Sequence, residues 1–312
     1  MNVIILGAAG FIGTNLVFEL VKEKNDYITL VDQNRDYFPT INLFRTPIIK
    51  IVESKFEYDT DWDSLLKDQD IVYHLISSTA PSTANQKIAQ EMTINVGMTA
   101  NLLDACVRQK VKKVIFLSSG GTVYGKAESY PLKETTSTDP ISSYGIQKLT
   151  IEKLLYLYHY MYNLDYRIIR LANPYGPYQR PNGALGAVTT FTYKALRGEQ
   201  IIVYGNGSVV RDYIYIADAI KAILKIVNGE SEYRIFNLGC GYGTSIGELL
   251  DIIKKTLNID LDIKYMPGRP VDVPVNYLDI SRFIKAYGKL NPIPLDDGIM
   301  RTANFMKQHY KL

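Results

Sequence analysis

The stretch Val3-Ile-Ile-Leu-Gly-Ala-Ala-Gly-Phe-Ile-Gly13 decides the fold class of this chain. Its first four residues form an apolar, β-branched run that predicts a buried strand, and the residues after it predict a helix through about Lys24. The three glycines between them let the backbone turn tightly and approach a pyrophosphate, for which a helix N-terminus supplies N–H groups and a positive dipole. The spacing is GxxGxxG rather than GxGxxG, but its place between strand and helix indicates nucleotide binding over a purely structural turn.

The rest of the first half repeats this alternation of strand and helix. Helical patterns at 89–109 and from near Ser143 separate apolar runs at 27–32, 48–53, 70–76, 113–119 and 166–172. Continuous apolar runs are typical of strands buried on both faces, and strand–helix alternation predicts a parallel, doubly wound sheet of the Rossmann type. From Asn173 to Gly186 we expect a loop, then a helix at 187–197, a strand at 201–204, and a last strand pair of the sheet in YIYIAD (213–218) and RIFNLG (234–239).

This pattern predicts an α/β protein of two domains. The Rossmann-type cofactor domain is expected over residues 1–173, with 212–238 returning to it. A smaller, mixed α/β substrate domain is expected from 174–211 and 239–312, packed over the carboxyl ends of the strands, where open α/β sheets bind ligands.

Composition excludes several function classes. The chain has 312 residues, 46% hydrophobic and 21% charged, and a net charge of +3 without a like-charged block, which argues against nucleic-acid and membrane-surface partners. Cys106 and Cys240 could form one bridge, but two free thiols in a reducing cytosol are favoured. Residues 1–18 lack the basic region and cleavage site of a signal peptide, and no apolar run is long enough to cross a membrane. We therefore expect a cytoplasmic protein, and no residue spacing predicts a metal site.

Asp32 ends the second predicted strand, 19 residues after Gly13. A carboxylate there can accept hydrogen bonds from both ribose hydroxyls of an adenosine and repels a 2′-phosphate, so NAD is favoured over NADP. Arg35 lies close enough in sequence to leave NADP open.

Tyr144 and Lys148 are four residues apart in a predicted helix, and so share one face. A free tyrosine has a pKa near 10, but a neighbouring ammonium and a positively charged nicotinamide favour the phenolate. Tyr144 is therefore a candidate general base near neutral pH. The stretch Ser118-Ser-Gly-Gly-Thr-Val-Tyr-Gly125 directly follows a strand, where its hydroxyls can hold a substrate hydroxyl or simply cap a turn.

Together these motifs resemble the extended short-chain dehydrogenase/reductase family, and within it the nucleotide-sugar epimerases of the UDP-glucose 4-epimerase type. The resemblance runs the whole length of the chain. It also includes INVGMTANLLDAC (94–106), RLANPYGP (170–177), VYGNGSVVRDYIYIAD (203–218) and GRPVDVPVNYLDISR (268–282).

The resemblance implies a site made of three groups of residues. Tyr144 and Lys148 would be the catalytic pair, with Ser119 or Thr122 orienting the substrate hydroxyl. The expected cofactor-binding residues are Gly7, Gly10, Phe11, Ile12, Gly13, Asp32, Asn34, Arg35, Lys55, Phe56, Leu75, Ile76, Ser77 and Asn95, together with Tyr144 and Lys148. The expected substrate-binding residues are Ser119, Gly120, Thr122, Asn173, Arg211, Arg269, Asp272 and Asn276, of which the two arginines would hold a diphosphate.

Departures from the family pattern narrow the expected chemistry. Many relatives have a third hydroxyl where this chain has Gly120, and dehydrating relatives have an acidic pair where it has Gly121 and Thr122. The resemblance therefore implies NAD-dependent 4-epimerisation of a UDP-sugar through a 4-keto intermediate, in a homodimer formed by the helices after strands four and five. Glucose/galactose is the first expectation for the sugar, followed by N-acetylglucosamine or a uronic acid, and Asn276 falls where the family varies pocket size. A net oxidoreductase or dehydratase of the same fold, and an NAD-sensing regulator, are the alternatives.

Overall fold

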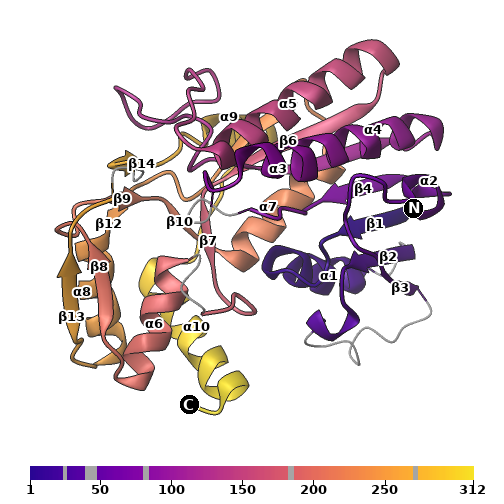
Figure 1. The fold of residues 1–312 in the computed structure, drawn as a ribbon. Coiled ribbons are helices and arrows are strands. Elements are labelled where there is room, and N and C mark those ends of the chain that lie inside the picture. The colour runs from indigo at the N-terminus through magenta and orange to yellow at the C-terminus, as the bar shows by residue number, and fades with distance from the viewer. Residues whose placement is uncertain (24–26, 39–47, 80–83, 182–185, 270–272) are drawn as a thin grey trace. The chain divides into compact units, whose positions relative to one another are not determined.

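Figure 1 shows the computed structural model of the chain, which describes residues 1–23, 27–38, 48–79, 84–181, 186–269 and 273–312. The chain divides into two compact units, each described here by itself. The first comprises Met1–Ser118, Ser142–Ile169 and Glu230–Ile235. The second comprises Ser119–Ile141, Arg170–Gly229 and Phe236–Leu312.

A seven-stranded sheet has the order β3-β2-β1-β4-β5-β6-β11. Its strands are β1 (Asn2–Leu6), β2 (Tyr27–Asp32), β3 (Ile49–Glu53), β4 (Ile71–His74), β5 (Lys113–Ser119), β6 (Asp165–Leu171) and β11 (Ile235–Leu238). The pairs from β3 to β5 are parallel, and the bonds from Ile168 to Arg234 and from Ala172 to Leu238 advance in one direction along β6 and β11. This arrangement confirms the predicted Rossmann-type fold, in which the order reverses beside β1.

One strand prediction was wrong. RIFNLG supplies β11, but YIYIAD does not join the large sheet: β10 (Tyr213–Tyr215) pairs with β7 (Asn173–Tyr175) in a separate two-stranded sheet. Helix α7 (Ile216–Asn228) follows at once, because apolar residues from Ile216 onward recur at helical spacing and are buried.

The helices of the first unit cover the sheet's apolar strands. They are α1 (Phe11–Glu23), the short turn η1 (Arg35–Tyr37), α2 (Trp62–Leu66), α3 (Ile88–Met92), the π-helical turn η2 (Thr93–Gly97), α4 (Met98–Arg108) and α5 (Ser143–Tyr162). The predicted helix at 89–109 is therefore a helix with a π-turn inserted, a feature frequent at functional sites. Leu102, Cys106 and Leu155 pack with Val114 and Phe116 into one buried core, where each fully buried large apolar side chain contributes about 1.5–3 kcal/mol.

The second unit is mixed α/β. Its further strands are β8 (Ile201–Tyr204), β9 (Val210–Arg211), β12 (Thr244–Ser245), β13 (Ile263–Met266) and β14 (Val275–Asn276). Its further helices are α6 (Ala187–Arg197), α8 (Ile246–Leu257), α9 (Ser281–Tyr287) and α10 (Leu295–Tyr310). The predicted helix at 187–197 and strand at 201–204 are confirmed. The domain boundaries stay a prediction, because β5, β6 and β11 each run from one unit into the other.

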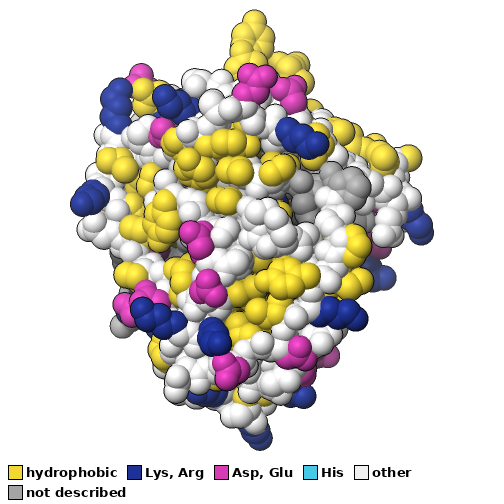
Figure 2. Space-filling view, turned by 90° about the vertical axis from the view of Figure 1, so that its left-hand side faces the viewer, with side chains coloured by type: hydrophobic (Ala, Val, Ile, Leu, Met, Phe, Trp, Pro, Cys, Tyr) yellow, Lys and Arg dark blue, Asp and Glu magenta, His cyan; other side chains and the backbone are white. Residues whose placement is uncertain are grey.

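The surface charges and the cysteines of the described residues follow the pattern expected from the composition. On the face shown in Figure 2, basic and acidic side chains are interspersed around apolar ones. Both cysteines are free and buried, as favoured from the sequence. Within the described part of the chain, no helix is long and apolar enough to cross a membrane, and no cluster of His, Cys, Asp or Glu could hold a metal ion.

Candidate active site

The glycine turn lies between β1 and the start of α1, as its sequence predicts. Gly7 has a φ of +85°, and a Cβ on Gly13 would lie 2.5 Å from the carbonyl oxygen of Gly7. Both positions therefore require glycine, the first for its backbone conformation and the second for space. The bare backbone at the N-terminus of α1 fits the pyrophosphate of a dinucleotide, as the family resemblance expects for Gly10, Phe11 and Ile12 as well.

Asp32 ends β2 and is 8% exposed. One carboxylate oxygen accepts from the backbone N–H of Ala9 at 2.9 Å, and the other from Gln33 at 2.8 Å. Asp32 therefore shapes the glycine turn from the end of β2, the position at which the family resemblance expects a contact with the adenosine ribose.

The other residues expected around the adenosine lie after β2 and β3. Asn34 caps η1 by accepting from the N–H of Asp36 at 2.8 Å, and Arg35 is exposed and donates to the carbonyl of Ile51 at 3.2 Å. Lys55 is exposed, whereas Phe56 is half-buried and stacks on Trp62. Part of the Phe56 ring therefore serves the core, and a role in adenine binding stays a prediction.

After β4, Leu75 and Ile76 are half-buried beside Gly7, and Ser77 is exposed. Asn95 lies in the π-turn and is 5% exposed. Its amide nitrogen donates to Gln147 Oε1 at 2.8 Å and to the carbonyl of Glu91 at 3.0 Å, while its oxygen accepts from Ser78 N and Oγ. These four bonds use the full capacity of the amide, so a cofactor contact through Asn95 would have to replace one of them.

Tyr144 and Lys148 lie in the first turns of α5, which Ser142 caps by accepting from the N–H of Gly145. Lys148 is 6% exposed, and its Nζ donates to the carbonyl of Leu117 at 2.8 Å. Nζ lies 5.7 Å from the ring centroid of Tyr144 and 4.7 Å from that of Phe116. The structure thus brings the predicted pair together on one helix face and anchors the lysine to β5.

Burial dominates the titration of this pair. It raises the pKa of Tyr144 to about 12 and lowers that of Lys148 to about 8, in each case because the charged form loses hydration. The depression of the Tyr144 pKa was expected from Lys148 together with a positively charged nicotinamide, and Lys148 within the chain does not provide it by itself. A further cation close to the phenol would be needed for Tyr144 to act as a base near neutral pH.

Glu152 is a residue of this site that the sequence reasoning missed. It is 3% exposed, accepts from Ser118 Oγ at 2.5 Å, and its negative charge raises the pKa of Lys148. Its signal was present in the sequence, since Glu152 follows Lys148 by four residues and so lies one helical turn farther along the same face.

Three expected substrate residues, Ser119, Gly120 and Thr122, begin the second unit. Gly120 leaves no room for a side chain, because a Cβ would lie 2.6 Å from Leu278 Cδ1 and 3.0 Å from the carbonyl of Arg170. Packing therefore leaves no room at position 120 for the hydroxyl residue that many relatives have there. The hydroxyl of Thr122 is buried and has no hydrogen-bond partner among the described residues.

Asn276, Arg211 and Asn173 lie around Asp212. Asn276 is opposite Arg211 in the parallel pairing of β14 with β9, is fully buried, and donates to the carbonyl of Gly120 at 3.1 Å. Asn173 donates to the carbonyl of Asp212 at 2.9 Å. Four of the predicted substrate residues, Gly120, Asn173, Arg211 and Asn276, are therefore assembled in one unit.

Arg211 and Arg269 differ in how firmly they are held. Arg211 Nη1 donates to the carbonyls of Val210 and Val273 at 2.8 and 2.7 Å, whereas Arg269 is exposed, with its guanidinium 4.5 Å from the ring centroid of Tyr204. Diphosphate binding by either arginine stays a prediction. Asp272, the remaining expected substrate residue, lies outside the described residues.

Asp212 is a second residue that the sequence reasoning missed. It is fully buried, and its carboxylate accepts from the backbone N–H groups of Cys240, Gly241 and Leu278 at 2.7, 3.2 and 3.3 Å. Burial raises its pKa to about 6 despite these bonds. Asp212 thus ties two segments, at Cys240–Gly241 and at Leu278, to the strand that carries Arg211, a role for which the sequence gives no local signal.

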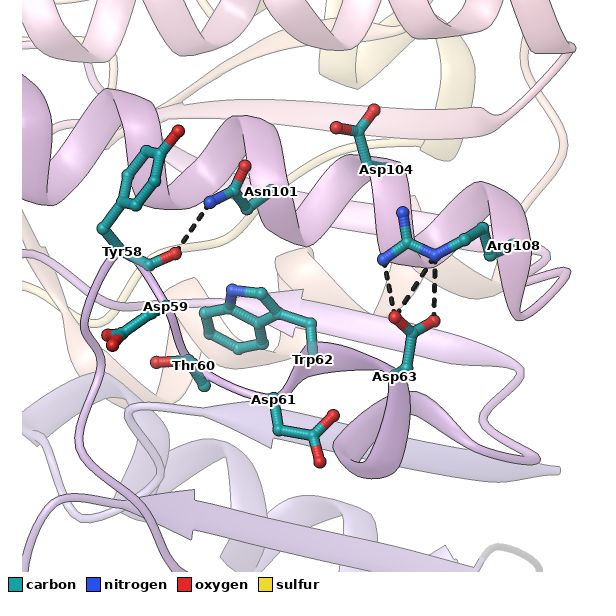
Figure 3. Close-up of a pocket in the computed structure, with 9 residues that line it drawn as sticks. All are labelled: Tyr58, Asp59, Thr60, Asp61, Trp62, Asp63, Asn101, Asp104 and Arg108. Atoms are coloured by element: carbon teal, nitrogen blue, oxygen red, sulfur yellow. Dashed lines mark hydrogen bonds and ion pairs between the residues drawn. The ribbon is translucent and has the colours of Figure 1, made fainter.

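Figure 3 shows a pocket of about 220 Å³ beside α2 and α4 that contains none of the predicted site residues. Three of its aspartates have structural partners. Asp61 accepts from the N–H of Ser64 at the start of α2, Asp63 pairs with Arg108 at 2.6 Å, and Asp104 accepts from the hydroxyl of Tyr158 at 2.6 Å. Asp61 therefore caps α2, whereas Asp63 and Asp104 join neighbouring helices, and these bonds give the three aspartates structural roles.

The chain is similar to known proteins over nearly its whole length. The profile of the NAD dependent epimerase/dehydratase family matches residues 3–239. A UDP-glucose 4-epimerase structure from Thermotoga maritima, with UDP-glucose, is 30% identical, with a TM-score of 0.90 over 99% of this chain and 100% of that one. A UDP-N-acetylglucosamine 4-epimerase from Methanobrevibacter ruminantium M1 is 30% identical, with a TM-score of 0.88 over 98% of each chain. A UDP-glucuronic acid 4-epimerase from Bacillus cereus, in complex with UDP-glucuronic acid and NAD, is 26% identical, with a TM-score of 0.89 over 99% of each chain. The chain belongs to the NAD-dependent epimerase/dehydratase family.

Proposed function

We propose that this protein is an isomerase, an NAD-dependent 4-epimerase of a UDP-sugar. The observation that carries the proposal is the buried pair on α5, in which Lys148 is fixed to β5 and lies beside the ring of Tyr144. Gly121 and Thr122 offer no acid–base pair for losing water from the sugar, so the chain's own residues support proton and hydride exchange at one carbon. The solved relatives named as 4-epimerases support the same reaction.

In the proposed mechanism, Tyr144 takes the proton of the sugar 4-hydroxyl, which Ser119 or Thr122 orients. Lys148 favours the phenolate and also binds the nicotinamide ribose. Burial lowers the pKa of Lys148, and the negative charge of Glu152 opposes this effect and so favours the protonated lysine, whose pKa is about 8. Arg211 and Arg269 hold the diphosphate while the flat 4-keto sugar turns over, and Tyr144 then returns the proton.

The residues present fit NAD as the cofactor. The glycine turn leaves its backbone bare, and the Asp32 carboxylate beside this turn would meet the ribose hydroxyls and disfavour a 2′-phosphate. Bound NAD would accept the hydride from sugar C4 and return it to the opposite face. Its positive nicotinamide would also be the additional cation that Tyr144 needs, because the phenol in the chain alone has a pKa near 12.

Proton NMR on the purified protein tests the proposal. The protein is mixed with UDP-galactose, then with UDP-N-acetylgalactosamine and UDP-galacturonic acid, without added NAD. Appearance of the gluco epimer supports 4-epimerisation with a retained cofactor. Accumulation of reduced NAD or of a 4-keto sugar would instead indicate a net oxidoreductase or a dehydratase. No turnover of any of the three, with NAD bound, would contradict the proposal and favour the NAD-sensing regulator.

The sugar is proposed as glucose/galactose, with N-acetylglucosamine and a uronic acid as alternatives. The solved relatives include enzymes named for each of the three sugars. The relative rates in the NMR experiment decide among them.

We also propose that the protein is a homodimer, formed through α4 and α5. Support comes from α5, where Tyr156, Leu157, Tyr160 and Met161 are 60%, 44%, 80% and 55% exposed. They form two adjacent pairs, 156–157 and 160–161, about one helical turn apart on one side of the helix, and an exposed apolar surface of this kind is typical of an interface. A cytoplasmic location is proposed as well, because both cysteines are free. Sedimentation that gives a monomer mass would exclude the dimer.

A further inference from the structure

A buried polar network surrounds the first turn of α5, and Glu91 lies at its centre. Glu91 belongs to α3 and is only 7% exposed. Its carboxylate accepts from the hydroxyl of Ser143 and, at 3.3 Å, from Nε2 of Gln147. Because Ser143 precedes Tyr144 and Gln147 follows it by three residues, one carboxylate holds α5 on both sides of the proposed base.

The same carboxylate also holds the chain that precedes α3. Its other oxygen accepts from the backbone N–H of Lys87 at 3.3 Å. Asn85 and Ser143 exchange two bonds, since Asn85 N donates to Ser143 Oγ at 3.1 Å and Ser143 N donates to Asn85 Oδ1 at 2.7 Å. The single hydroxyl proton of Ser143 therefore goes to Glu91. This bond, together with the backbone bond from Lys87, holds the pKa of Glu91 below its usual range.

Gln147 extends the network to the π-turn and to the residues after β4. Its Oε1 accepts from Asn95 Nδ2 at 2.8 Å and from Thr79 Oγ1 at 3.1 Å. The donors and acceptors thus connect three segments to the turn that carries Tyr144. Nothing in the proposed mechanism uses Glu91, yet burying an ionised carboxylate is costly unless its bonds are strong and well aligned.

We propose that Glu91 is a positioning residue for Tyr144, and that its ionised carboxylate fixes the first turn of α5 so that the phenol meets the substrate hydroxyl at reactive distance. This inference rests on the proposed function for its catalytic consequence. Charge-assisted bonds are short and directional, which suits them to hold a helical turn in place. A displacement of about 1 Å in a reacting group can reduce a rate by about 10²-fold.

The test is Glu91→Gln, studied as the purified, NAD-loaded full chain. The glutamine must direct its NH₂ group toward one of the donors that now meet the carboxylate. We expect kcat to fall about tenfold, while KM for the UDP-sugar and the bound NAD change less than about twofold. Amide hydrogen exchange at residues 143–147 should accelerate. Ser143→Ala is a second variant, expected to show a smaller loss of kcat in the same direction should Glu91→Gln fold poorly.

Asp104→Asn is the matched control. Asp104 also accepts a hydroxyl bond from α5, from Tyr158 at 2.6 Å, but 14 residues beyond Tyr144. It should accelerate exchange near Tyr158 and leave kcat within about twofold. Equal kcat losses in Glu91→Gln and Asp104→Asn, or an unchanged kcat in Glu91→Gln, would overturn the positioning role.

Hydrogen exchange separates this inference from the proposed function. If the wild-type protein turns over no UDP-sugar, the proposed function fails, but the exchange rates still show whether Glu91 holds the turn. Unchanged exchange at residues 143–147 in Glu91→Gln would overturn the inference whatever the activity.

Discussion

The first turns of α5 and the segment from Ser119 to Thr122 differ in how their buried polar groups are bonded. At α5, the buried polar side chains are bonded to one another, and Asn95 uses all four positions of its amide. In the second unit, Thr122 Oγ1 and Asn276 Oδ1 are buried without a partner among the described residues. The chain itself therefore sets the geometry at α5, whereas the second segment retains hydrogen-bonding capacity that a ligand can fill. Substitutions at the first should change rates, and substitutions at the second should change binding and stability.

Tyr144→Phe should have the largest effect. Loss of the hydroxyl removes the proposed base, and general acid–base groups contribute typically about 10²–10⁴-fold, so kcat should fall by that factor. NAD content and thermal unfolding should stay close to wild type, because the phenol hydroxyl makes none of the network bonds around Glu91. Steady-state epimerisation rates with cofactor content measured by absorbance test this expectation, and a kcat within threefold of wild type would refute the assignment of the base.

His74→Gln should change the pH dependence of stability in the first unit. His74 is fully buried beside Phe116, and burial together with Lys148 lowers its pKa to about 3, against about 6.5 in an unfolded chain. Because the folded pKa is depressed, its contribution to stability is present above pH 6.5 and is lost as the pH falls toward 3. Between pH 6.5 and 5 the wild type should therefore lose about 2 kcal/mol from this group.

Urea unfolding at pH 7 and pH 5 measures this loss. Glutamine can still donate to Thr99 Oγ1, which the imidazole Nε2 bonds at 2.9 Å, but it does not titrate. The variant should lose about 2 kcal/mol less than the wild type on going to pH 5. Equal losses in the two proteins would show that water or a charge partner reaches His74.

The residues at the start of α5 were easier to predict from the sequence than those around Ser119–Thr122, because they lie close together in the chain. Tyr144 and Lys148 are four residues apart, so local helix geometry alone brings them together. The glycine turn and Asp32 are likewise set by one strand–turn–helix unit. Sequence spacing also identified α6 and the parallel sheet, because their apolar periodicity is local.

The parts that could not be predicted depend on contacts between distant segments. Gly120 meets Asn276, 156 residues later, and Asp212 receives bonds from Cys240 and Leu278, which no local pattern announces. Glu91 lies 52 residues before Ser143 and carries no motif. YIYIAD does form a strand, β10, but this strand pairs with β7 instead of joining the large sheet, and sheet membership depends on contacts that the local sequence does not specify.

Thr122→Val and Ser119→Ala should separate the two candidate hydroxyls. Valine replaces a buried hydroxyl without a partner by a methyl group of similar shape, so unfolding free energy should rise by about 1 kcal/mol. If Thr122 orients the substrate, kcat/KM falls about tenfold in that variant while Ser119→Ala stays within threefold. The opposite ratio would assign the role to Ser119. Urea unfolding and initial rates provide both readouts, and a destabilised Thr122→Val would show that its hydroxyl already has a partner in solution.

Asn276→Ser should have the smallest effect, and it distinguishes two roles for the same side chain. Asn276 is fully buried and donates to the carbonyl of Gly120, so the structure favours support of the Ser119–Thr122 segment. In that case the shorter serine leaves the carbonyl unpaired, and KM rises about threefold for UDP-galactose and UDP-N-acetylgalactosamine alike. If Asn276 instead borders the sugar, as the family resemblance implies, the smaller side chain selectively improves the N-acetyl substrate. The ratio of the two KM values therefore decides whether the residue acts on the sugar directly or through the backbone of Gly120.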